Sequence, residues 1–284
     1  MNNVASEAGA LRDWLFEQAL PFWWEVGADR SRGGFHEAID FDGKPVANPH
    51  RARTIARQAF SYCEAGRLGW SGPWREAAQH ALGYFHKCFV AVDNTVASVV
   101  DLDGRCCDPR FDLYNQAFAL LAYASAHRAF GKAAGWDRHA LALRATLEQN
   151  YAHPLGGFLE DPADRLQHSA NPHMHLLEAA LAWCALDADP GWRQMVDGLV
   201  ALCLEKMIEP ASGALREFFA ADWTPAPGTT GCICEPGHHY EWAFLLDRWA
   251  TILNRKKPEA VGRLIAFADA HGIDQVRGVA INSC

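Results

Sequence analysis

The sequence has 284 residues, of which 50% are hydrophobic and 21% are charged, and such a chain buries a large core as one or two domains. Its net charge of -8 at pH 7, with no dense run of Lys and Arg, excludes the basic surface that a nucleic acid requires. The apolar stretches are interrupted well before a membrane-spanning length and the first residues lack a signal-peptide pattern, so we expect a cytoplasmic protein that binds no membrane.

Helical spacing of apolar side chains dominates the sequence, and the alternation that is typical of strands is rare. One predicted helical face consists of Phe111, Tyr114, Phe118 and Leu121, which follow one another at intervals of three or four residues. We predict helices over residues 8–26, 53–69, 72–89, 110–131, 136–151, 173–187, 190–208, 239–256 and 258–271. We also expect Pro21 to kink the first helix, because proline removes a backbone donor.

Glycine turns recur between the predicted helices. The segments 33–37, 156–160 and 213–217 read GGFHE, GGFLE and GALRE, and each is expected to turn a short hairpin. Similar turns between helical pairs predict a stack of αα-hairpins with loops on one face, either a helical solenoid or a closed toroid. A toroid has a central cleft in which aromatic and polar side chains gather, and such clefts suit sugars.

The segment EPGHHYEW, residues 235–242, is the strongest candidate for chemistry. Pro236 and Gly237 interrupt the chain and an apolar helical run follows, which places His238 at or near a helix N-terminus. Glu241 lies three residues later and can share its face, where it could fix the tautomer of an imidazole that exchanges protons near neutral pH. The alternative interpretation is that His238 only caps the helix.

A second polar helix start is NPHMHLLE, residues 171–178. We expect Asn171 to be its N-cap and His175 and Glu178 to face one direction. His173 and His175 diverge if both are helical, which weakens the interpretation as a zinc site. The nine cysteines include no Cys-x-x-Cys pair, so we expect reduced thiols, no metal and no cofactor.

Two other segments offer polar groups to a cleft. Arg53 and Arg57 lie four residues apart on one predicted helix, and an arginine pair usually marks a solvated face. If Arg57 instead points into the cleft, its guanidinium can stabilise the negative charge of an enediolate. Tyr114, in the segment FDLYNQ, can offer its hydroxyl to a sugar, although an ordinary helix start explains this segment equally well.

The order of four segments resembles the N-acylglucosamine 2-epimerase family. These segments are ARQ at 56–58, DLYNQAF at 112–118, NPHMH at 171–175 and PGHHYEW at 236–242. The resemblance spans essentially the whole chain, and NPHMHLLEA and EPGHHYEWA are most similar to the bacterial mannose isomerase branch. It implies an all-α fold, an (α/α)6 toroid of helical hairpins that forms a single domain over residues 1–284 and binds a monosaccharide.

The resemblance also implies a reaction and roles for individual residues. The reaction is a metal-free acid/base isomerisation of mannose to fructose, or a C2 epimerisation, through a cis-enediolate. His238 matches one of two catalytic histidines, and Arg57 matches an arginine that contacts the reacting oxygens. The positions expected to bind substrate, with Glu178 added because of its helical spacing from His175, are Tyr114, Asn171, His175, Glu178 and Glu241.

The resemblance also implies that further helical hairpins follow a segment like residues 278–282. The second catalytic histidine of the family lies in those hairpins and has no counterpart in this sequence, so we expect a shortened chain with impaired activity. A catalytically silent carbohydrate-binding protein is the alternative. A glycoside hydrolase on the same fold would need two carboxylates among Asp112, Glu178 and Glu241, and a zinc-dependent phosphomannose isomerase would need a metal. The sequence defines neither the sugar nor the oligomeric state.

Overall fold

A computed structural model describes residues 2–161 and 167–284 of the chain. They form two compact units, the first made of Met1–Phe111 and Leu121–Leu143, and the second of Asp112–Leu120 and Arg144–Cys284. The chain passes between the units within α5 (Leu113–Phe130) and again within α6 (Trp136–Thr146). That the chain is a single domain stays a prediction.

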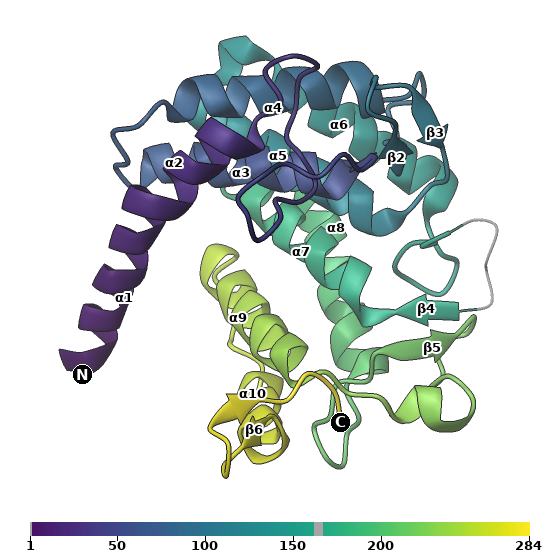
Figure 1. Cartoon of the computed structure of the whole chain (residues 1–284). Helices are drawn as coiled ribbons and strands as arrows, with labels where there is room; N and C mark the ends of the chain where they lie inside the picture. Colours follow the sequence, from purple (N-terminus) through teal and green to yellow (C-terminus); the bar gives the residue numbers. More distant parts are fainter. Residues whose placement is uncertain (1, 162–166) are drawn as a thin grey trace. The chain divides into compact units, whose positions relative to one another are not determined.

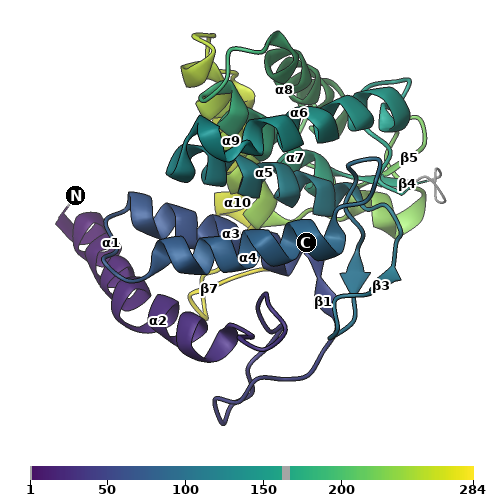
Figure 2. The same ribbon diagram turned by 90° about the horizontal axis from the view of Figure 1, so that it is seen from above.

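The first unit is built around α3 (Ala52–Arg67) and α4 (Trp74–Phe89), which lie side by side (Figure 2). It begins with α1 (Asn2–Trp14) and α2 (Leu20–Phe22), which are joined and followed by π-helical turns at Leu15–Ala19 and Trp23–Gly27. A small antiparallel sheet pairs β1 (His50–Arg51) with β2 (Val99–Val100), and β2 with β3 (Cys106–Asp108). A 3-10 turn at Lys132–Ala134 follows α5.

The second unit is built around α7 (Ala170–Cys184), which packs against both α8 (Pro190–Leu202) and α9 (Pro236–Ile252). Figure 1 shows α10 (Ala260–His271) beside α9, and β4 (Gln167–Ser169) beside β5 (Phe218–Ala220). The remaining elements are π-helical turns at Leu147–Tyr151 and Cys203–Met207, a 3-10 turn at Gly228–Cys232, and the paired strands β6 (Ile273–Asp274) and β7 (Val279–Ala280).

Each predicted helical range contains a helix of the structure, and the boundaries differ by a few residues. The largest difference is at the start, where α1 begins at Asn2 instead of residue 8. Its first turns carry no apolar stripe, so helical periodicity could not reveal them, although Ala and Glu favour helix intrinsically. Pro21 lies between the two π-helical turns, and both proline and π-turns interrupt the regular helical hydrogen-bond pattern.

The predicted glycine hairpins are present as short turns that follow helix ends. Isolated antiparallel bridges close them at Ala28 and Phe35, at Ala152 and Phe158, and at Ile208 and Leu215. Gly157 has a φ of +74°, and a Cβ there would lie 2.7 Å from a methyl group of Leu202. Only glycine fits such a position without strain, so this turn depends on the residue that the sequence motif provides.

Two buried histidines tie such turns to the helices that follow them. His173 Nδ1 lies 3.0 Å from the carbonyl oxygen of Ser169, and its Nε2 accepts the backbone N–H of Phe158 at 3.1 Å. His239 repeats this pattern, with Nδ1 2.9 Å from the Glu235 oxygen and Nε2 accepting the Leu215 N–H at 2.8 Å. Both rings are therefore neutral with the proton on Nδ1, and burial lowers both pKa values, that of His173 to about 4.

None of the helices in the described parts of the chain combines the length and apolar character that crossing a bilayer requires.

The core of the second unit includes a stacked pair of tryptophans. The rings of Trp183 on α7 and Trp192 on α8 lie 5.3 Å apart at 12°, and both side chains are fully buried. Trp183 Nε1 also donates a hydrogen bond of 2.9 Å to the carbonyl oxygen of Leu120. Hydrophobic burial, ring stacking and a satisfied donor thus coincide at one side chain.

We expect Trp183→Ala to lower the free energy of unfolding by ~3–5 kcal/mol, because it opens a cavity and removes the hydrogen bond to the Leu120 carbonyl oxygen. Urea denaturation followed by circular dichroism measures this change. Trp14→Ala is the matched control, since Trp14 is 54% exposed, and it should change the free energy by less than about 0.5 kcal/mol. Equal losses in the two variants would contradict the assignment of Trp183 to the core.

Candidate active site

His238 lies on the first turn of α9, where proline and an extended residue set the start of the helix. Glu235 is the N-cap with extended backbone angles, and Pro236 follows at the first helical position, where its missing N–H costs no hydrogen bond. The His238 N–H donates to the Glu235 oxygen at 3.0 Å. The predicted position at a helix N-terminus is therefore correct, with the helix starting three residues earlier than expected.

The His238 imidazole contacts two carboxylates. Its Nδ1 lies 3.0 Å from Glu217 Oε1 and 3.4 Å from Glu235 Oε2. Glu217 is only 2% exposed, and both its Oε1 and His238 Nδ1 are buried without a hydrogen bond of good geometry among the described residues, so the two atoms meet as a close ion-pair contact. A proton on Nδ1 faces this buried carboxylate most favourably, and the contact therefore favours the tautomer that leaves Nε2 for chemistry.

The carboxylates change the acidity of His238. Burial disfavours the charged imidazolium, but the contact with Glu217 and the charges of Glu217, Glu235 and Glu241 outweigh it, so the pKa of His238 is raised above 6.5. Burial in turn raises the pKa of Glu217, although the contact with His238 opposes this shift. Each charge therefore stabilises the other, because either group alone would be a poorly solvated charge.

Glu217 is a candidate site residue that the sequence interpretation did not select, and the expected role of Glu241 needs correction. Glu241 was predicted to orient His238, but Glu217 is the carboxylate against Nδ1. The signal was available in the glycine turns, because Glu217 ends GALRE as Glu37 ends GGFHE and Glu160 ends GGFLE.

The three glutamates occupy equivalent positions against the next helix. Glu37 accepts the N–H of Arg51, the N-cap of α3, at 2.6 Å, and Glu160 accepts the N–H of Ser169, the N-cap of α7. Glu37 also accepts the hydroxyl of Thr54 at 3.0 Å, three residues after its N-cap. His238 is likewise three residues after the N-cap Glu235. Its contact with Glu217 therefore corresponds to the contact of Thr54 with Glu37.

A second cluster surrounds His175 on α7. Its Nδ1 lies 3.3 Å from Glu178 Oε2 and 3.8 Å from Glu241 Oε1. The ring packs edge-on to Tyr114 at 5.0 Å and against Phe118 at 4.7 Å. The structure therefore brings together four of the predicted substrate-binding residues, Tyr114, His175, Glu178 and Glu241, from α5, α7 and α9.

A hollow of about 430 Å³ is lined by both His238 and Glu241. Its lining also includes Ile273, Ile281 and Asn282, from the segment after α10. This volume is in the range of a small-molecule pocket. An imidazole and a carboxylate thus line one hollow, an arrangement that general acid/base chemistry uses.

Asn171 does not cap α7 as predicted. The N-cap is Ser169, because β4 runs directly into the helix and Ala170 N–H donates to the Glu217 carbonyl oxygen. Asn171 lies in the first turn, and its Oδ1 is buried without a hydrogen-bond partner in the described parts of the chain. The predicted divergence of the two histidines is correct, since His173 is buried against the Phe158 turn and His175 faces the glutamates.

Arg57 lies on α3, in the first compact unit, and its side chain is exposed. The other predicted site residues belong to the second unit. A role for Arg57 beside the sugar therefore stays a prediction.

Two groups of described residues have donor atoms that could hold a divalent cation. One consists of His175, Glu178 and Glu241 and the other of Glu217, Glu235 and His238, with ligand atoms within 4.8 Å of one another in each. Carboxylates beside an imidazole are common zinc ligands, but they are also the groups that general acid/base catalysis uses.

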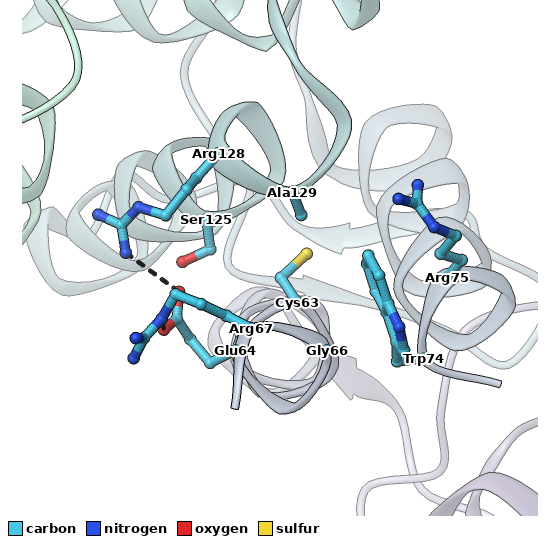
Figure 3. A pocket seen from close by; sticks show the side chains of 9 residues that line it. All are labelled: Cys63, Glu64, Gly66, Arg67, Trp74, Arg75, Ser125, Arg128 and Ala129. Atoms are coloured by element: carbon cyan, nitrogen blue, oxygen red, sulfur yellow. Dashed lines mark hydrogen bonds and ion pairs between the residues drawn. The ribbon is translucent and has the colours of Figure 1, made fainter. Parts of the chain in front are cut away.

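The first unit has a smaller hollow of about 230 Å³, shown in Figure 3. Its carboxylate, Glu64, is held by Arg67 at 2.5 Å and by Arg128 at 3.4 Å, and Arg75 packs over the ring of Trp74. No histidine lines this hollow. It therefore lacks the acid/base pair found beside α9.

Comparison with known proteins gives the same family along nearly the whole chain. The family model for N-acylglucosamine 2-epimerase (GlcNAc 2-epimerase) matches residues 33–283. A mannose-6-phosphate isomerase from Rhizobium meliloti is 43% identical over 251 residues, which cover 87% of this chain and 65% of that protein. The chain thus spans just under two thirds of that relative's length.

Solved structures share the fold. A cellobiose 2-epimerase from Bacillus thermoamylovorans superimposes with a TM-score of 0.87 at 19% identity, covering 100% of this chain and 76% of that one. A D-mannose isomerase structure gives a TM-score of 0.80 at 19% identity, covering 96% and 73%. The predicted all-α fold of the (α/α)6 toroid class is confirmed. On the match of its sequence and its fold, the chain belongs to the N-acylglucosamine 2-epimerase family.

Proposed function

We propose that this chain is a sugar isomerase that interconverts an aldose and its ketose, with mannose and fructose as the first pair to test. The single observation that carries the proposal is the His238–Glu217 contact of 3.0 Å beside a hollow of about 430 Å³. The relatives named mannose-6-phosphate isomerase and D-mannose isomerase support the choice of sugar.

The proposed chemistry begins with neutral His238. With Nδ1 held by Glu217, Nε2 takes the proton from C2 of the open-chain aldose, and the electrons of the broken C–H bond form a cis-enediolate. The same imidazolium then returns a proton to C1, and the proton of the C2 hydroxyl moves to O1, which gives the ketose. Arg57 is the proposed partner of the negative oxygen, and Tyr114, Asn171, His175, Glu178 and Glu241 are the proposed contacts of the sugar hydroxyls.

A site with a single base on one face of the sugar favours isomerisation over epimerisation. A cis-enediolate is planar at C1 and C2, so a base above one face reaches both carbons. One imidazole can therefore remove a proton at C2 and deliver it at C1. Epimerisation at C2 requires protonation from the opposite face, and therefore an acid on the other side of the sugar. We therefore propose the aldose-ketose exchange, which needs only the one base assigned here, His238 beside Glu217.

We expect His238→Ala to lower kcat/KM for mannose by ~10²–10⁴, because a positioned general base contributes about this factor. Product analysis by NMR in deuterated water with mannose, fructose, glucose and mannose 6-phosphate measures it. His239→Ala is not a suitable control, because it breaks a buried turn, whereas His271→Ala changes an imidazole in the last turn of α10. Unchanged turnover in His238→Ala would overturn the assignment of the base. Sugar binding without turnover in the unmodified chain would support a silent binding protein instead.

A labelled substrate separates the one-base isomerase from an epimerase. With mannose carrying deuterium at C2 in ordinary water, we expect part of the label at C1 of fructose, since the imidazolium that took it also returns it. Glucose as the main product, with its C2 label exchanged for solvent hydrogen, would contradict the one-base path.

We expect Glu217→Gln to lower the pKa of His238, because the amide removes the charge that opposes the effect of burial. The raised pKa contributes stability below the ordinary histidine pKa of about 6.5, and this contribution is lost as pH rises through the folded value. In the variant this low-pH stabilisation should disappear, and the acid limb of kcat/KM should move to lower pH.

NMR titration of the histidine ring signals measures that pKa without needing turnover, with the His238 signal identified by its loss in His238→Gln. Glu178→Gln is the matched control, since Glu178 contacts His175 and not His238. An unchanged His238 pKa in Glu217→Gln would show that Glu217 does not control the ring.

A further inference from the structure

Two cysteines that are distant in sequence form a backbone pair beside the hollow. The N–H of Cys234 donates to the Cys284 oxygen at 2.9 Å, and the N–H of Cys284 donates to the Cys234 oxygen at 2.9 Å. Residues that exchange both bonds are an antiparallel hydrogen-bonded pair, with Cα atoms about 5.5 Å apart and side chains on the same face. Disulfides usually span Cα distances of about 4.4–6.8 Å, so this pair has the Cα spacing of a disulfide, and a small approach of the two Cβ atoms brings the sulfurs to bonding distance.

Both thiols are free, and their surroundings differ. Cys284 is exposed, whereas Cys234 is buried with its sulfur 3.7 Å from the carbonyl oxygen of Cys232. Burial, and next the neighbouring thiol of Cys284, raises the pKa of Cys234 to about 11. The closeness of the two residues rests on the backbone pairing, and the Cys284 thiol acts on the pKa of Cys234 in the same direction as burial does.

The pair also joins two walls of the hollow. Cys234 directly precedes Glu235 and the first turn of α9, and Cys284 lies two residues after Asn282, which lines the hollow together with Ile281 as a second wall segment. The backbone of this second wall is tied to the end of α10 through the Ile281 N–H and the Gly272 oxygen, 2.8 Å apart. A covalent link between the two cysteines would therefore fasten the segment after α10 to the helix start that carries His238.

We propose that Cys234 and Cys284 are a thiol oxidation site, which a low-molecular-weight disulfide such as oxidised glutathione converts into an intramolecular disulfide. The exposed Cys284 thiolate attacks one sulfur of oxidised glutathione and releases one molecule of reduced glutathione. The Cys234 thiolate then attacks the Cys284 sulfur and releases the second. Two protein thiols are oxidised and one glutathione disulfide is reduced, with both thiol protons ending on the two glutathione molecules. Any effect of this link on sugar turnover rests on the proposed function, whereas the link itself does not.

The test uses the whole chain incubated with oxidised glutathione, after which remaining thiols are alkylated and the protein is digested with trypsin without reduction. We expect a cross-linked peptide that joins residues 278–284 to residues 217–248, together with the loss of two free thiols. Because Cys232 and Cys234 lie on the same tryptic peptide, the digestion is repeated on Cys232→Ser, which should keep the link, and on Cys234→Ser, which should lose it. Cys106→Ser is a further control at an exposed cysteine far along the chain, and it should keep the link.

A second readout follows the backbone. Hydrogen exchange of residues 272–284 should slow after oxidation in the unmodified chain and not in Cys284→Ser, because a covalent link limits opening of the segment. A link from Cys284 to Cys232 would overturn the proposal, as would glutathione mixed disulfides on the exposed cysteines without a linked peptide. The peptide map does not depend on activity, so a failure of the sugar isomerase proposal would leave this result interpretable.

Discussion

The contact between a glutamate at the end of a glycine turn and the start of the following helix organises this chain. The first N–H groups of a helix have no partner within the helix, and a carboxylate placed there satisfies one of them and also interacts favourably with the helix dipole. Glu37 and Glu160 do this at α3 and α7 through the N–H of the N-cap residue. The turn is thereby fixed to the helix, so that residues near the N-cap have defined positions before any substrate is considered.

The same contact explains why a histidine three residues after an N-cap can become a base. In the α3 copy the second carboxylate oxygen accepts the hydroxyl of Thr54, which is a neutral donor. In the α9 copy the corresponding position is His238, and the carboxylate meets an imidazole instead. Because Glu217 is only 2% exposed, its charge is poorly screened by water, and its influence on the ring is correspondingly strong. The α9 copy therefore pairs its carboxylate with an imidazole where the α3 copy pairs one with a hydroxyl.

Helical periodicity was sufficient to predict nearly all helices, and the motifs correctly placed His238 on a first helical turn. Helical periodicity also grouped His175 with Glu178, because side chains three residues apart lie on one face of a helix.

Contacts between distant segments could not be predicted from periodicity. Glu217 is 21 positions before His238, and its role depends on a turn folding back onto the start of α9, which only the comparison of the three glycine turns could have suggested. Asn171 was assigned as a cap for a related reason, since the sequence does not show that β4 ends at Ser169 and leads directly into α7.

Each of the segments 171–175 and 236–242 carries two histidines in one helical turn, and one of the two has a structural role. His173 and His239 are each four residues after an N-cap, and both use Nδ1 on the N-cap oxygen and Nε2 on the N–H of the preceding turn. With both nitrogens engaged and the charged form disfavoured by burial, neither ring can exchange protons with a ligand without breaking the turn that it holds.

His238 differs from these two histidines. Its Nδ1 contacts a carboxylate and its side chain lines the hollow, so its Nε2 is available. In the pair His238 and His239, the residue that resembles a catalytic base and the residue that holds the fold are therefore neighbours. An exchange of their roles would require α9 to rotate by about 100°, the angle between successive residues of an α-helix.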